Sequence, residues 1–329
     1  MRFSPMPMHI PDGFLSTLVS VSIWIVSAVL VAVAILRTRR RLGERIVPLM
    51  GVLAAFLFAA QAINFPVAGG TSGHLLGAAL VAILLGPWPS VLVLTAVVAV
   101  QGLLFQDGGL LAMGANILNM AILGSLGAAA VYRIALRLAG QSRAGRLASA
   151  FAAGWTSVVL GAVAVAIELA LSGVSPVTLV LPAMAGVHML IGLGEGMITA
   201  GAIAFLQKVR PDLLHAGEAG HGTRSGALVA GGLALALLLA LFSPIASPFP
   251  DGLERVARDL GFASRESAPL LQVLSDYTLP FVRNPAIATL LAVGVGTLVV
   301  FIVATLVGRL AVRFGHRRPG ARPERPRAS

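Results

Sequence analysis

The chain contains no cysteine, which excludes disulfide bonds, thiolate metal sites and thiol redox chemistry. It is also poor in charge, because only 11% of its 329 residues are Asp, Glu, Lys or Arg, whereas 57% are hydrophobic. A chain of this composition cannot cover a water-soluble globule with an ordinary polar surface. Its 24 basic residues lie between apolar runs and not along one aromatic-containing face, which argues against nucleic-acid binding. The composition therefore predicts an integral membrane protein.

The apolar runs predict an all-α polytopic bundle of about nine transmembrane helices, seven plus two, because roughly 20 apolar residues cross a bilayer. The runs cover residues 15–36, 46–63, 74–87, 88–105, 110–133, 147–171, 178–207, 226–243 and 286–310. The third and fourth are short and are separated only by Gly-Pro-Trp-Pro at 86–89. This sequence favours a tight helical hairpin over one long bent segment.

The distribution of basic residues predicts the orientation, because cytoplasmic loops are enriched in Lys and Arg. If the N-terminus is outside and nine spans alternate, most of the 24 basic residues are cytoplasmic. The outside then keeps only Arg2, Arg255, Arg258, Arg265 and Arg283. We therefore expect the N-terminus outside.

Two membrane modules are joined by a Gly-rich, charged connector. The expected divisions are an N-terminal metal-binding segment at 1–14, a membrane domain at 15–209, a cytoplasmic linker at 210–225, a two-helix module at 226–310 with an outside segment at 244–285, and a basic tail at 311–329. The tail is rich in Pro and Arg, so we expect it to be disordered and near anionic lipid. In the outside segment, Leu253, Val256 and Leu260 predict a short amphipathic helix.

Two histidines fall at the outside ends of their helices in this topology. His9 follows Met8 in a Pro-bounded segment, and His74 opens the third span after a Gly-rich loop. Imidazole without thiolate suits zinc, copper, nickel and cobalt. If Met8 begins the mature chain, its α-amine and the His9 backbone nitrogen and Nδ1 would form fused chelate rings, with His74 as fourth ligand. Ni(II) and Cu(II) prefer such a plane of nitrogens. The alternative for His74 is a hydrogen-bonded cap in a re-entrant loop.

Other polar residues in the apolar runs need a partner or a function. The candidates around the histidines are Asn64, Thr71, Ser72, Asn116, Asn119, His188 and Glu195. Asn116 and Asn119 lie on one helix face, where they would either orient His74 or bond to neighbouring helices. His188 and Glu195, seven residues apart, would form either a proton or metal relay or a buried pair satisfied by the surrounding helices.

Four segments carry a family resemblance: MHIPDGFLS, INFPV followed by GGTSGHLLG, GANILNMAILG, and GVHMLIGLGEGMIT. They closely resemble the hallmark segments of the CbiM/NikM proteins, the substrate-binding membrane components of energy-coupling-factor importers for cobalt and nickel. The second module resembles the PDGLE-type NikN partner, fused here in one chain. The resemblance implies metal ligands at Met8, His9 and His74, a location in the prokaryotic cell membrane, and nickel in preference to cobalt.

The sequence departs from the family pattern because seven residues precede Met8, whose nitrogen is then an amide. Translation from Met8, removal of residues 1–7, or a different donor would each resolve this, and the first is favoured. The family chemistry requires a free chain end.

The energy source is expected on other subunits, because the sequence has no G-x-x-x-x-G-K-[ST] phosphate loop. The resemblance implies two ATPase subunits and a transmembrane coupling subunit as partners. We expect no enzymatic activity and no cofactor, with Ni(II) or Co(II) as transported substrate. A stand-alone secondary transporter driven by the proton gradient is the alternative function, supported by His188 and Glu195.

Overall fold

The computed structural model describes residues 9–41, 46–215, 225–268, 271, 273–274 and 277–313. Met8, most of the linker and nearly all of the basic tail lie outside these described residues. The helices and strands are α1 (Thr17–Arg41), α2 (Val47–Gln61), β1 (Phe65–Val67), β2 (Thr71–Gly73), α3 (Ala78–Leu85), α4 (Pro87–Val100), the π-helical turn η2 (Gln101–Phe105), α5 (Met113–Asn116), the π-helical turn η3 (Ile117–Leu123), α6 (Gly124–Ala139), α7 (Arg143–Leu171), α8 (Val177–Val209), η4 (Pro211–His215), α9 (Ser225–Ala240), η5 (Ser243–Ile245), α10 (Gly252–Asp259), η6 (Ala263–Arg265) and α11 (Pro285–Arg313).

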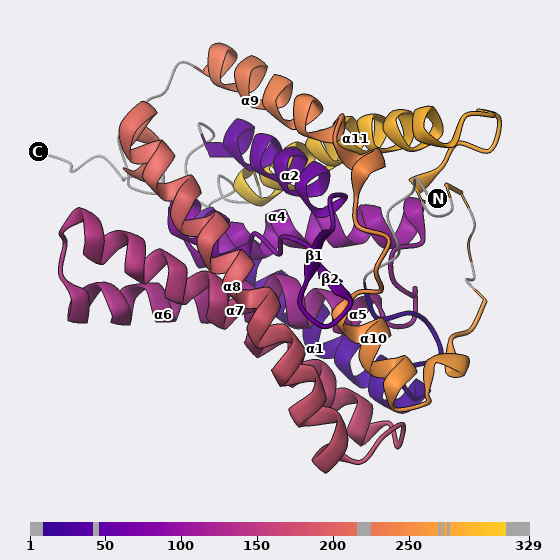
Figure 1. The fold of residues 1–329 in the computed structure, drawn as a ribbon. Coiled ribbons are helices and arrows are strands. Elements are labelled where there is room, and N and C mark those ends of the chain that lie inside the picture. The colour runs from indigo at the N-terminus through magenta and orange to yellow at the C-terminus, as the bar shows by residue number, and fades with distance from the viewer. Residues whose placement is uncertain are drawn as a thin grey trace, which may run out of the picture.

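The fold is a helical bundle, as the sequence predicts (Figure 1). Within the described residues, seven helices are long and apolar enough to cross a membrane: Thr17–Thr38, Pro87–Phe105, Met113–Ala139, Arg143–Leu171, Val177–Val209, Gly226–Ile245 and Pro285–Arg313. Large apolar side chains stay exposed on them, such as Leu18 at 78% on α1, because lipid takes the place of water there. The chain is therefore a multi-pass membrane protein. The count of nine spans and the outside N-terminus stay predictions.

Two of the nine predicted spans are shorter than a bilayer is thick. Helix α2 has 15 residues and α3 has eight, whereas a span needs about 20. The chain reverses at Gly86, whose φ of 88° is left-handed, and the Ser90 hydroxyl returns to the Ala78 carbonyl at 3.2 Å. The predicted hairpin at Gly-Pro-Trp-Pro is therefore present.

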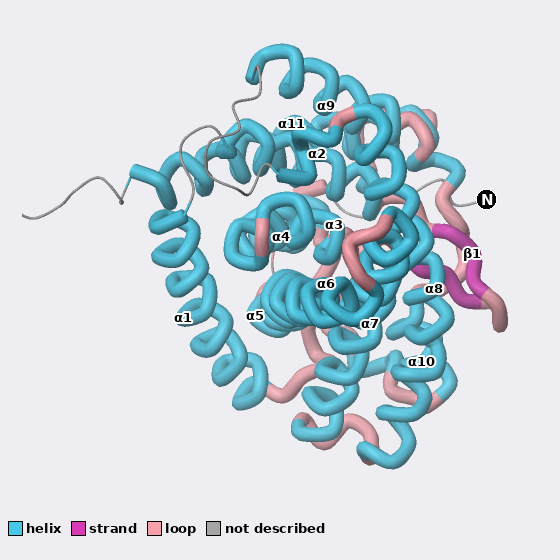
Figure 2. Tube along the Cα trace, turned by 90° about the vertical axis from the view of Figure 1, so that its left-hand side faces the viewer, coloured by secondary structure: helices cyan, strands magenta, loops and turns pink. Residues whose placement is uncertain are grey.

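The second module packs on the first through α2. Helices α9 and α11 both contact α2, and α11 also contacts α4. Figure 2 shows this group across the top of the bundle, with α4 and α6 at the centre, α1 on one side and α8 on the other. Gly296 of α11 lies against Phe58 of α2, where a Cβ would clash with the ring. Helix α2 is thus enclosed by both modules, which explains why a short apolar helix is almost entirely buried.

A short antiparallel hairpin carries the predicted Gly-rich loop. Strands β1 and β2 pair with Pro66 opposite Ser72, and Gly69 and Gly70 make the turn with φ of 85° and 75°. Ser72 also donates its backbone N–H to the Pro250 carbonyl at 2.8 Å. The hairpin therefore fastens the segment before α10 to the first module.

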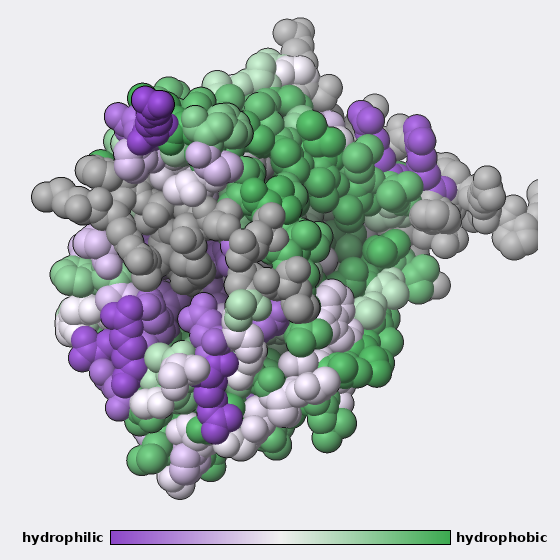
Figure 3. Space-filling model, turned by 90° about the vertical axis from the view of Figure 1, so that its right-hand side faces the viewer, coloured by the Kyte–Doolittle hydropathy of each residue, from purple (hydrophilic) through white to green (hydrophobic). Residues whose placement is uncertain are grey.

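The predicted amphipathic helix is present as α10. Leu253 and Val256 are buried against the first module, whereas Arg255 and Arg258 face outward in ion pairs with Asp259 and Glu254. Figure 3 shows hydrophilic residues gathered at the lower left of the molecule and a hydrophobic surface that extends up the right-hand side. Helix α10 thus closes one end of the bundle with a polar outer face.

Candidate metal centre

Two polar side chains dock the N-terminal segment into the bundle. The Asp12 carboxylate accepts the backbone N–H groups of Leu110, Leu111 and Ala112 at 2.8–3.1 Å, just before α5. Asn116 of α5 accepts the Ile10 N–H at 3.0 Å and donates to the Ile10 carbonyl at 3.1 Å. These bonds fix residues 10–12 and therefore the entry of His9 into the interior.

Asp107, in the loop between η2 and α5, holds His9. The His9 backbone N–H donates to Asp107 Oδ1 at 3.2 Å. Ring nitrogen Nδ1 lies 2.9 Å from the same oxygen and 3.0 Å from the Asp107 carbonyl oxygen. Because both partners accept, Nδ1 carries a proton, whereas Nε2 is buried without a hydrogen-bond partner among the described residues. Two His9 nitrogens therefore converge on a single atom.

The loop before α3 presents His74 to His9. The two ring centroids are 5.8 Å apart, with the rings at 85° to each other. With metal–nitrogen bonds of about 2.0–2.1 Å, two imidazoles on one ion have centroids roughly 4.5–6.4 Å apart, so this separation is compatible with a shared ion. The Glu195 carboxylate of α8 holds the loop by accepting the Leu76 and Gly77 N–H groups at 2.7 and 2.9 Å. The predicted meeting of His9 and His74 is thus present in the structure.

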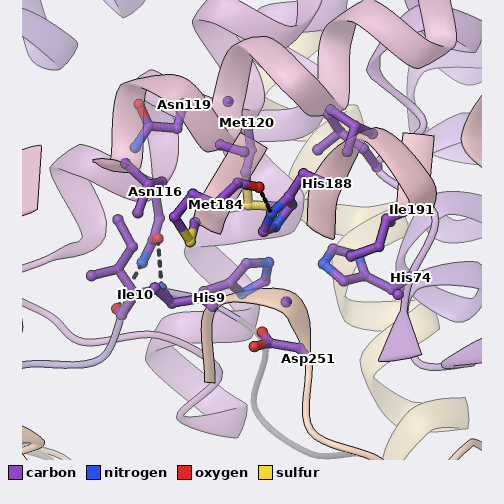
Figure 4. Close-up of a pocket in the computed structure, with 18 of the residues that line it drawn as sticks. His9, Ile10, His74, Asn116, Asn119, Met120, Met184, His188, Ile191 and Asp251 are labelled. Atoms are coloured by element: carbon purple, nitrogen blue, oxygen red, sulfur yellow. Dashed lines mark hydrogen bonds between the residues drawn. The ribbon is translucent and has the colours of Figure 1, made fainter. Parts of the chain in front are cut away.

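A cavity of about 110 Å³ separates these side chains from α8 and α10. Figure 4 shows its wall, with His9, His74 and His188 around one space and Asp251 below them. Asn116, Asn119, Met120 and Met184 also line it. Gly252 follows Asp251 and allows the close approach of α10, because a Cβ there would lie 2.8 Å from His188 Nε2. Both modules therefore contribute to the wall of one cavity.

Burial favours neutral imidazole on His74. Burial, together with the nearby His9, lowers the pKa of His74 from 6.5 to about 4. Burial alone would lower the pKa of His9 as well, but the charge of Asp107 and its hydrogen bonds outweigh burial and raise it. Burial raises the pKa of Asp251 from 3.8 to about 7. A divalent cation in the cavity would offset the cost of burying the negative charge of Asp251 and would compete with protons for His9.

His, Asp and Glu side chains alone do not complete a metal site in the described part of the chain. Within it, no group of three His, Asp or Glu side chains lies close enough to hold an ion. A metal between His9 and His74 would therefore need donors of another kind, such as backbone or chain-end nitrogens. The predicted ligand Met8, which would supply the chain-end amine, lies outside the described residues.

The predicted residues of the Gly-rich loop form hydrogen bonds to the second module, and none of the hydrogen bonds of the described residues joins them to His74. The Thr71 hydroxyl donates to the Pro250 carbonyl at 3.0 Å, and the Ser72 hydroxyl donates to the Phe249 carbonyl at 2.8 Å. Asn64 lies at the base of the hairpin, where its carbonyl accepts the Ser247 N–H at 2.9 Å. Ser72 alone of these three side chains reaches the cavity wall.

The remaining predicted residues bond to neighbours other than His74. Asn119 donates to Glu168 at 2.8 Å, and Asn116 holds Ile10 as described. His188 Nδ1 bonds to the Met184 carbonyl at 2.8 Å, one turn away on α8, whereas Glu195 anchors the loop before α3. The expectation that the two asparagines orient His74 therefore has no hydrogen bond to support it. His188 and Glu195 also bond to separate partners.

Four important residues were not identified from the sequence: Asp12, Asp107, Asp251 and Tyr277. The three aspartates share a signal that the sequence did offer, since each precedes a glycine. At Gly108 the glycine is required, because its φ is 99° and a Cβ there would lie 2.9 Å from the Cβ of His9. No local pattern marks Tyr277, whose hydroxyl donates to Asp107 Oδ2 at 2.6 Å across the two modules.

Similar proteins agree with this architecture. Residues 9–213 match the CbiM family, described as a cobalt uptake substrate-specific transmembrane region, and residues 226–313 match the PDGLE domain. The putative fused nickel transport protein NikMN of Archaeoglobus fulgidus is 38% identical over 92% of this chain and 99% of its own length. The cobalt transport protein CbiM of Sorangium cellulosum is 36% identical over 63% of this chain and 94% of its own. A crystal structure of a truncated transition metal transporter, 32% identical, covers 61% of this chain and 99% of its own with a TM-score of 0.55.

Fold, site and relatives together define a membrane component for transport of nickel or cobalt. The chain belongs to the CbiM family and carries a fused PDGLE domain, in the arrangement of the NikMN proteins.

Proposed function

We propose that this chain is the substrate-binding membrane component of an ATP-driven energy-coupling-factor importer, and that it captures Ni(II) in preference to Co(II). The observation that carries the proposal is the apposition of His9 and His74 across a small cavity. The preference for nickel rests on the fused PDGLE domain and on the similarity to the fused nickel transport protein.

The proposed ligands are the Met8 α-amine, the His9 backbone nitrogen, His9 Nδ1 and the His74 imidazole. The two His9 nitrogens already point at one atom, Asp107 Oδ1, and donors that share one acceptor can share one metal ion. Binding would replace this oxygen by the metal and would release the protons of the amide and of Nδ1. The proposal includes a mature chain that begins at Met8, because only a chain end supplies the amine.

The proposed energy source is a pair of ATPase subunits acting through a transmembrane coupling subunit. The alternative, a proton-driven transporter, would use His188 and Glu195 as a relay. In the structure the Glu195 carboxylate accepts two backbone N–H groups and His188 bonds to Met184. These bonds favour a structural role for both residues, which supports the ATP-driven proposal.

Uptake of radioactive nickel by cells that express the chain tests the mechanism. We expect uptake only when the ATPase and coupling subunits are co-expressed, and we expect it to survive a protonophore while ATP is maintained. Uptake by the chain alone that stops with the protonophore would contradict the proposal and would identify a secondary transporter. Competition by unlabelled cobalt in the same assay measures the metal preference.

A further inference from the structure

The second module places one carboxylate, that of Asp251, in the wall of the cavity between the histidines. Asp251 immediately precedes α10 and is only 6% exposed. In Figure 4 it lies below His9, His74 and His188, and all four residues line the same cavity. An acidic side chain of the second module therefore shares one small space with the two candidate imidazole ligands of the first.

This carboxylate has no cationic partner of its own. Both arginines of α10 form ion pairs with acidic residues of the same helix on its outer face, and no Lys or Arg in the described part of the chain forms an ion pair with Asp251. The nearby charges of Glu254 and Asp107 repel a negative charge on Asp251, and only His9 attracts it. Burying an unpaired carboxylate is costly, so the cavity is suited to a cation.

Helix capping accounts for only one of the two carboxylate oxygens. Asp251 Oδ1 accepts the Glu254 N–H at 2.6 Å and caps the start of α10. Oδ2 accepts no hydrogen bond within the described residues. Asn and Ser cap helices about as well as Asp without carrying a charge. The cap therefore does not explain why a charged side chain stands in this buried position.

The backbone on both sides of Asp251 is held against the first module. The Pro250 carbonyl accepts the Ser72 backbone N–H at 2.8 Å and the Thr71 hydroxyl at 3.0 Å. On the other side, Gly252 lies so close to His188 that a Cβ would clash with the imidazole ring. These contacts make the Asp251 carboxylate a fixed part of the cavity wall.

We propose that Asp251 supplies a negative charge that holds the divalent cation in the cavity without taking one of the four ligand positions. This inference rests on the proposed function, in which the cavity binds the transported ion. Of the four proposed ligands only the deprotonated His9 amide carries a negative charge, so the bound ion keeps part of its positive charge. The Asp251 carboxylate stabilises this charge at short range, where little water screens it.

The test removes the charge of Asp251 and keeps the helix cap. Asp251→Asn does this, because Asn caps a helix about as well as Asp. Asp259→Asn is the matched control, since Asp259 is 57% exposed at the other end of α10. Nickel affinity is measured on the full chain in detergent by competition with a chromophoric chelator, at pH 8, above the pKa of about 7 that burial gives Asp251. We expect Asp251→Asn to bind nickel about 10–100-fold more weakly, the range for residues that act from behind the ligands, and Asp259→Asn to change the affinity less than about twofold.

Thermal melting of the metal-free chain at the same pH separates a functional charge from a structural one. Removing a buried charge that lacks a cation should leave the melting temperature of Asp251→Asn unchanged or raise it. A residue that only supports the fold would lower the melting temperature and the affinity together, and that result would overturn the proposal. An affinity equal to that of Asp259→Asn would overturn it as well. The visible spectrum of the nickel-saturated chain should be the same with and without the substitution, and a changed spectrum would make Asp251 a ligand instead.

His74→Ala distinguishes this inference from the proposed function. If His74→Ala abolishes binding while Asp251→Asn matches Asp259→Asn, the role of the Asp251 charge is wrong and the metal site stands. If His74→Ala binds nickel as tightly as the unmodified chain, the proposed ligands are wrong, and the inference about Asp251 is wrong with them.

Discussion

Replacing Glu195 by glutamine should weaken metal binding without unfolding the chain. The carboxylate accepts the Leu76 and Gly77 N–H groups at 2.7 and 2.9 Å, and so fixes the loop that presents His74. Glutamine has one oxygen, so one N–H would face an amide NH₂ group. The lost charge-assisted bond costs about 1.5–3 kcal/mol, and the unsatisfied buried donor about 1–3 kcal/mol. Relaxation of the loop would recover part of this sum.

A remaining destabilisation of the loop by about 2 kcal/mol would raise the dissociation constant for nickel roughly 30-fold. Isothermal titration of Glu195→Gln measures it. Glu168→Gln is the matched control, because Glu168 is also buried but its carboxylate accepts from the Asn119 side chain. We expect the control to lose less than about threefold, since a glutamine oxygen can still accept from Asn119. If Glu195→Gln binds nickel normally but does not transport it, the anchoring role is wrong and the relay role is favoured.

The remaining predictions concern the N-terminal segment and His74. Asn116→Ala removes two hydrogen bonds to Ile10, each contributing about 1 kcal/mol, so nickel should bind at least about tenfold more weakly in the same titration; an unchanged affinity would show that Asp12 suffices for docking. Because folding lowers the pKa of His74 from 6.5 to about 4, His74 binds a proton between these pH values in the unfolded chain but not in the folded chain. The metal-free chain should therefore lose stability as the pH falls from 6.5 towards 4. Thermal melts of His74→Gln should show a smaller acid loss than the unmodified chain, and an equal loss would refute the assignment. Square-planar Ni(II) is diamagnetic, so ¹⁵N spectra of labelled histidine should show the metal on His9 Nδ1, and a shift confined to Nε2 would contradict the chelate.

The helices could be predicted from the sequence because their signal is local. Apolar runs and the Gly-Pro-Trp-Pro turn carry their own conformational preferences, so the long helices and the α3–α4 hairpin follow from composition and spacing. The burial of α2 could not be predicted in this way. Helix α2 is buried because α4, α9 and α11 enclose it, and two of these helices, α9 and α11, belong to the second module, far along the sequence.

In the candidate site, too, the residues with a local sequence signal could be predicted and those that depend on tertiary packing could not. His9 and His74 were identifiable because each stands out in an apolar sequence beside Gly or Pro turns, and the topology placed them together. Asp107 meets Tyr277, 170 positions away, only through tertiary packing. Glu195 stands out in the sequence as a charge in an apolar run, but its two backbone partners lie in a distant loop, so the sequence does not predict its anchoring role.

Native intact mass spectrometry of the chain purified from cells given nickel and cobalt tests the central claim most directly. One spectrum reports both the true N-terminus and the bound ion. The account predicts a chain that begins at Met8 and carries one nickel ion, and it predicts that His74→Ala and His9→Ala chains carry none. A chain that begins at Met1 and keeps its metal, or a His74→Ala chain that still binds one ion, would contradict the proposed ligands.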